Sequence, residues 1–164
     1  MKSKVAYFGV FVALALIFSY VESLIPIQLG IPGVKLGLAN LVIVIVLYKT
    51  NLKMALLLSI TKAILSGFLF GNMFSILYSM AGGILSLVVM ALLRRREGFS
   101  VIGISIAGGV FHNVGQLLMA MVAMETVRVM YYFPILLIAG VLTGFLIGVI
   151  AQEALKRLVF LQIK

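Results

Sequence analysis

The sequence alternates between apolar stretches, most of them about twenty residues long, and short clusters of basic residues. Of the 164 residues 64% are hydrophobic and only 10% are charged, whereas a soluble domain averages about 25% charged residues. An apolar helix of about 20 residues crosses the roughly 30 Å hydrocarbon core of a bilayer. We therefore expect an all-α, polytopic membrane protein that forms a single integral membrane domain over residues 1–164.

Six transmembrane helices are predicted from the apolar stretches. The first follows Lys2 and Lys4 and lacks a cleavage site of the signal-peptide type, so we expect it to remain in the protein. The predicted spans cover residues 5–25, 36–48, 54–70, 74–93, 101–124 and 132–155.

The basic clusters predict the topology. They are Lys2 and Lys4, Lys49 and Lys53, Arg94 to Arg96, and Lys156, Arg157 and Lys164. A cytoplasmic N-terminus places all of them on the cytoplasmic side, as the positive-inside rule requires, and predicts a multi-pass protein of the cell membrane with both termini in the cytoplasm. A five-span alternative, in which the short second segment only re-enters, would put Arg94 to Arg96 and the C-terminal basic residues on opposite sides. The same pattern explains the net charge of +9, so we expect no nucleic-acid partner.

Metal and cofactor sites are not expected. The chain has no cysteine and one histidine, which excludes disulfides and leaves little for a transition metal. We predict no catalytic residues, no metal and no cofactor.

A few polar side chains fall inside or beside the predicted spans, where an ionisable group costs about 2.5 to 3.5 kcal/mol to insert. Most of them lie in the outer half of the predicted bundle, which favours an outward-facing cavity for a small-molecule ligand over a channel. The predicted ligand-binding residues are Lys35, Asn40, Lys62, Asn72, His112, Asn113, Gln116 and Arg128.

Several of these residues have an alternative structural role. His112 and Gln116 are four residues apart, so they face one space, yet they could equally form interhelical hydrogen bonds. Lys62 could bind an anion or pair with Glu22. Arg128 could pair with Glu125, three residues away.

Small residues recur at four-residue intervals in the last and first spans. Gly140, Gly144 and Gly148 allow a neighbouring backbone to approach closely, as do Gly9 and Ala13. Packing within the bundle explains either set, and docking of a separate membrane subunit is the alternative for the first helix.

Residues 27–35 read IQLGIPGVK and are too apolar for a solvated loop, so we expect them to fold over the outer mouth of the bundle. Together with Glu22 to Pro26, the string PGVKLGLANLV (Pro32 to Val42) resembles the heptaprenyl diphosphate synthase component I family, also called the Gx transporter family. That family looks like the S components of energy-coupling factor (ECF) transporters.

This resemblance implies a six-helix bundle with an outer capping loop after the first helix. It also implies that Gly9 and Ala13 contact an ECF coupling subunit that works with ATPases, and that Lys35, Leu36, Gly37, Leu38, Ala39 and Asn40 form part of a pocket or its lid. The expected function is capture of a vitamin-like or isoprenoid-precursor-like molecule for import.

Two other hypotheses remain open. The family's name suggests prenyl elongation, but that chemistry needs clustered aspartates, and the four acidic residues here are all glutamates with no two within twenty positions. A non-catalytic accessory role beside a soluble prenyl synthase is therefore the alternative function, and a purely structural membrane subunit is the third.

Overall fold

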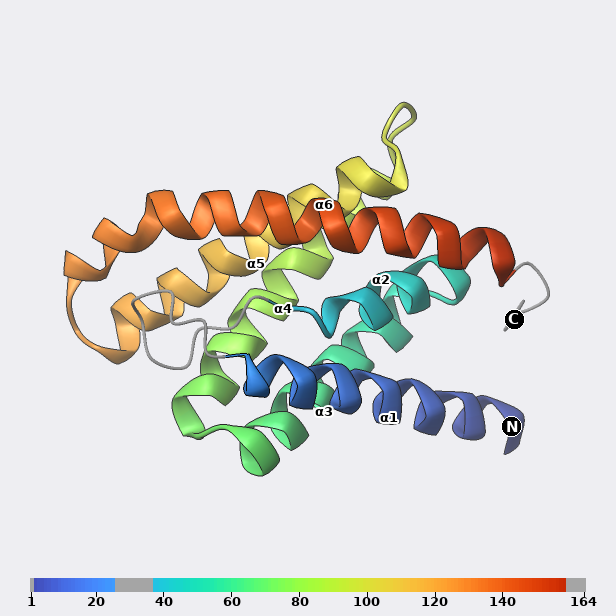
Figure 1. Ribbon diagram of the computed structural model, residues 1–164, viewed down its shortest axis with the longest axis horizontal. Helices are drawn as coiled ribbons and strands as arrows, with labels where there is room; N and C mark the ends of the chain where they lie inside the picture. Colours follow the sequence, from blue (N-terminus) through green and yellow to red (C-terminus); the bar gives the residue numbers. More distant parts are fainter. Residues whose placement is uncertain (1, 26–36, 159–164) are drawn as a thin grey trace.

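The computed structural model describes residues 2–25 and 37–158, and within these residues it is helical, without strands (Figure 1). In chain order the elements are α1 (Lys2–Leu24), α2 (Asn40–Lys49), α3 (Leu52–Phe70), α4 (Met73–Arg94), α5 (Val101–Ala123), the short 3₁₀ helix η1 (Val127–Tyr132) and α6 (Phe133–Arg157).

Five helices, α1, α3, α4, α5 and α6, are long and apolar enough to cross a membrane. The second predicted span, 36–48, is not confirmed as one, because α2 has only 10 residues and extends about 15 Å, half of a hydrocarbon core. The predicted capping loop after α1 falls on residues 26–36, outside the described residues.

Helix α2 is the centre of the bundle. Its sequence, NLVIVIVLYK, is apolar on every side, and such a helix is stable only where neighbours cover its whole circumference. Helices α1, α3 and α6 all pack against it, and Val42, Ile43, Val44 and Val46 are buried. Because β-branched residues have modest helix propensity, burial by neighbours is what maintains this helix.

Capping side chains define where three of the long helices begin. The side chains of Asn51, Asn72 and Ser100 accept hydrogen bonds from the backbone N–H groups of Met54, Ser75 and Gly103, at 3.0, 2.9 and 3.1 Å. Such caps contribute about 1 kcal/mol each. They fix the two short turns that reverse the chain direction between α2 and α3 and between α3 and α4.

The described basic residues gather at one end of the bundle. Helix α1 begins and α6 ends on the same side of Figure 1, and Arg94 and Arg95 at the end of α4 share a hollow with the α2–α3 turn. Among the described Lys and Arg residues, Lys62 lies near the middle of the bundle, and only Arg128 lies at the other end, on η1. We call these the basic end and the opposite end.

Glycines bring α5 and α6 into backbone contact, as the small-residue spacing predicts. A Cβ on Gly144 would lie 2.6 Å from the Ser105 carbonyl oxygen, and one on Gly140 would lie 2.9 Å from that of Gly109. By contrast, Gly9 on α1 is exposed and has no described atom within 4 Å of its Cβ position. The small residues of α6 therefore serve packing, whereas Gly9 faces outward.

Replacement of Gly144 by Leu should destabilise the bundle by at least about 2 kcal/mol, because the backbones of α5 and α6 must separate to admit the side chain. Gly9→Leu is the matched control and should unfold at the wild-type temperature. Thermal unfolding in detergent, followed by circular dichroism, measures both. Equal unfolding temperatures for the two variants would contradict the packing described here.

Candidate functional site

The N-terminal end of α2 lies inside the bundle, and buried polar side chains from several helices surround it. Asn40, the first residue of α2, is 8% exposed, and Lys62 near the middle of α3 is 5% exposed. His112 at the middle of α5 is 1% exposed, and Gln116, one turn further along, is fully buried. We call these four residues, with Glu22 and Gly37, the central polar cluster.

A hydrogen bond between Glu22 and Gly37 connects α1 to the residues just before α2. The backbone N–H of Gly37 donates a 2.5 Å hydrogen bond to Oε1 of Glu22, which is buried near the end of α1. Gly37 has a φ of +90°, and a Cβ there would lie 2.7 Å from Nδ2 of Asn40. Only glycine fits this conformation without strain. A turn follows, in which the N–H of Asn40 donates to the Gly37 carbonyl at 2.8 Å.

His112 is held between α4 and the start of α2. Its Nε2 lies 2.5 Å from Nε2 of Gln116, so in a neutral ring Nε2 accepts and Nδ1 carries the proton. A Cβ on Gly82 of α4 would lie 3.0 Å from Nδ1, and one on Gly37 would lie 3.4 Å from Cδ2. Two glycines therefore allow the imidazole to fit between the two segments, and Gln116 orients it.

Two buried polar atoms of the central polar cluster remain able to form a hydrogen bond. Among the described residues, Oδ1 of Asn40 has no hydrogen-bond partner and Nδ1 of His112 makes no well-formed hydrogen bond. The charge of Lys62 acts on the His112 ring. Buried polar atoms are nearly always satisfied, and a helix N-terminus favours negative charge. The cluster therefore provides an acceptor (Oδ1 of Asn40), a donor (Nδ1 of His112) and positive charge (Lys62 and the N-terminus of α2) for a polar or anionic group within the apolar bundle.

The other predicted site residues lie elsewhere. Asn113 donates from Nδ2 to the Leu136 carbonyl of α6 at 2.7 Å, so it joins α5 to α6. Asn72 is exposed and caps α4, about 15 Å along that helix from Gly82. Arg128 is exposed on η1 and borders a surface hollow with Val127, Met130 and Tyr131. Lys35 falls outside the described residues.

The structure also bears on the predicted depth and pairing of the polar groups. Lys62 and His112 lie near the middle of their helices. The predicted Glu125–Arg128 ion pair is not among the ion pairs found between described residues, which include those of Glu153 with Lys156 and Arg157. Pairing of Glu22 with Lys62 stays a prediction. No three acidic, histidine or cysteine residues in the described part of the chain are grouped to hold a metal ion.

The contribution of α4 to the site was not predicted from the sequence. Ser75, Ser79, Gly82 and Ser86 are all buried, and they recur every three or four residues, which places them on one face. This spacing was a usable signal, because small polar residues line helix contacts in apolar bundles. It identifies the face of α4 that receives His112.

Glu22→Ala should loosen the start of α2, because it leaves the buried Gly37 N–H without its acceptor at a cost of about 1 to 3 kcal/mol. Hydrogen exchange of the amides of residues 37–42 should then accelerate, while exchange in the middle of α5 stays slow. Glu22→Gln retains an acceptor oxygen and should have a smaller effect. Glu97→Ala, at an exposed turn, is the control, and equal exchange in Glu22→Ala and Glu97→Ala would contradict the role of Glu22.

No curated protein and no solved structure matches the chain significantly. A family model described as heptaprenyl diphosphate synthase component I matches residues 11–154, a range that includes the central polar cluster and every helix in whole or in large part. The chain belongs to the heptaprenyl diphosphate synthase component I family.

Proposed function

We propose that this protein is a non-catalytic membrane component of a heptaprenyl diphosphate synthase, acting beside a separate synthase that carries out the chemistry. Membership of the component I family supports this role directly. The sequence supports the non-catalytic part, because diphosphate-bound magnesium needs clustered carboxylates and the chain's four glutamates are far apart in sequence.

The central polar cluster is the observation that carries the proposal. Burying Lys62, His112 and Asn40 together costs free energy, since each must be removed from water. A ligand with an anionic head and an apolar body offsets that cost, because its head meets Lys62 and the start of α2 while its body contacts apolar side chains. An isoprenoid diphosphate has this chemistry.

The proposed orientation puts the basic end in the cytoplasm, following the positive-inside rule. The proposal keeps six passes, with α2 as the described part of the second. Both termini lie in the cytoplasm of a cell-membrane protein, and a soluble synthase would meet the basic end.

Reconstitution with a soluble prenyl synthase from the same organism tests the proposal. Nanodiscs carrying this protein should bind the synthase and change its rate or product chain length. Lys62→Met should reduce that change by about tenfold or more, because a buried cation that meets an anionic head makes a charge-assisted hydrogen bond, while methionine preserves the side-chain volume.

Lys156→Met is the matched control, because Lys156 is exposed at the end of α6, and it should behave as wild type. Unchanged synthase activity with and without the wild-type protein would exclude the accessory role. An unchanged effect in Lys62→Met would remove the central polar cluster from it.

A second candidate function is the ligand-binding subunit of an ECF-type importer. The exposed small residues of α1 favour it, since Gly9 and Ala13 leave a face on which another helix could pack closely. Gly9→Leu discriminates between the two functions. It should prevent co-purification with a coupling subunit if the protein is an importer subunit, and should leave synthase stimulation intact if it is an accessory component.

A further inference from the structure

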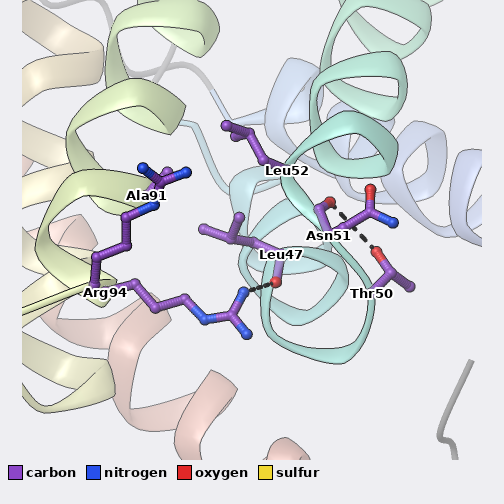
Figure 2. Close-up of a pocket in the computed structure, with 7 residues that line it drawn as sticks. Leu47, Thr50, Asn51, Leu52, Ala91 and Arg94 are labelled. Atoms are coloured by element: carbon purple, nitrogen blue, oxygen red, sulfur yellow. Dashed lines mark hydrogen bonds between the residues drawn. The ribbon is translucent and has the colours of Figure 1, made fainter. Parts of the chain in front are cut away.

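A second polar site lies at the basic end, away from the central polar cluster. A hollow of about 350 Å³ opens between the α2–α3 turn and the end of α4 (Figure 2). Its lining combines apolar side chains with hydrogen-bonding groups: Leu47, Thr50, Asn51, Leu52, Ala91, Arg94 and Arg95. No residue of the central polar cluster takes part in it.

Arg94 is held in a fixed position at this hollow. Its Nη1 donates to the carbonyl of Leu47, as Figure 2 shows, and its Nη2 donates to that of Tyr48 at 3.5 Å. The guanidinium carbon also lies 4.9 Å from the centre of the Tyr48 ring. Arg94 thereby stabilises the C-terminal end of α2. Because a guanidinium has five N–H donors, three remain for another acceptor.

The start of α3 adds further donors to the same wall. Asn51 uses its side-chain oxygen to accept from Met54, which leaves its NH₂ group available. The N–H groups of Leu52 and Lys53, the first two of α3, have no acceptor in the described part of the chain. The N-terminus of this 19-residue helix also carries partial positive charge.

The charge around the hollow is strongly positive. Lys49 and Lys53 flank the α2–α3 turn, and Arg96 follows Arg95 at the end of α4. Glu97 is the one acidic residue beside them in sequence, and it is exposed. Close cations repel one another unless an anion is bound between them.

We propose that this hollow binds the phosphate head of a membrane amphiphile, with Arg95 and the free donors of Arg94 contacting phosphate oxygens. Planar guanidinium groups match phosphate geometry, and Leu47, Leu52 and Ala91 suit the first carbons of an apolar chain. The head group comes either from an anionic phospholipid or from a prenyl diphosphate. Only the second source rests on the proposed function.

Binding of farnesyl diphosphate to the protein in phosphatidylcholine nanodiscs tests the site. We expect saturable binding that weakens about tenfold or more in Arg95→Gln, because a charge-assisted hydrogen bond is lost. The side chain of Arg95 makes no hydrogen bond or ion pair among the described residues, so its replacement should not unfold the protein. Inorganic diphosphate should compete with the lipid in wild type.

Arg96→Gln is the matched control, since it removes the same charge one residue away without lining the hollow. It should change the affinity by less than about twofold, as exposed charges do. Equal weakening in the two variants, or absence of saturable binding, would overturn the proposal and leave only general attraction to a basic surface.

A second set of nanodiscs containing phosphatidylglycerol distinguishes the two sources. Weaker apparent binding of farnesyl diphosphate there, in wild type but not in Arg95→Gln, identifies the phospholipid head as the occupant. Unchanged binding identifies the prenyl diphosphate. Stimulation of the soluble synthase is measured on the same samples, so that loss of this site alone leaves the proposed function standing.

Discussion

The structure depends on a short helix, α2, that begins in the middle of an apolar bundle. Helix α2 has only 10 residues and is almost entirely buried, so both of its ends must be satisfied by other parts of the protein. At its start Glu22 receives the Gly37 N–H, and at its end Arg94 donates to the Leu47 and Tyr48 carbonyls. An acidic residue near the start and a basic residue near the end match the direction of the helix dipole.

Glycine contacts determine where the central polar cluster can form. Gly82 lets α4 approach the His112 backbone and ring, and Gly109, Gly140 and Gly144 bring α5 against α6. The rotation of α5 is therefore fixed from two sides, with His112 directed toward α2 and Asn113 directed toward the Leu136 carbonyl. These two adjacent residues thus have different roles: His112 belongs to the central polar cluster, and Asn113 joins α5 to α6.

Sequence periodicity and charge predicted the long helices well, because a span needs only length and apolar composition. They did not predict that the helix of the second segment would be only half as long as a membrane span. Where that helix begins depends on the contact between Glu22 and Gly37, which are far apart in sequence. The structure gathers four of the predicted site residues, Asn40, Lys62, His112 and Gln116, around the start of α2, and their binding of a ligand stays a prediction. The side chain of Asn72 caps α4, and residue type alone does not distinguish a cap from a ligand-binding residue.

The two polar sites are separated by apolar structure. Between the start of α2 and the basic end, α2 contributes Leu41 to Leu47, and the buried polar side chains at that depth on α3, α4 and α5 are the hydroxyls of Ser59, Ser86 and Ser105. Serine hydroxyls can bond to their own helix, although Oγ of Ser105 has no hydrogen-bond partner among the described residues. A charged group leaving the central polar cluster toward the basic end would have to cross about 15 Å of this packing. The described bundle therefore fits two separate binding sites better than one continuous polar path, and any exchange between them requires α2 or its neighbours to move.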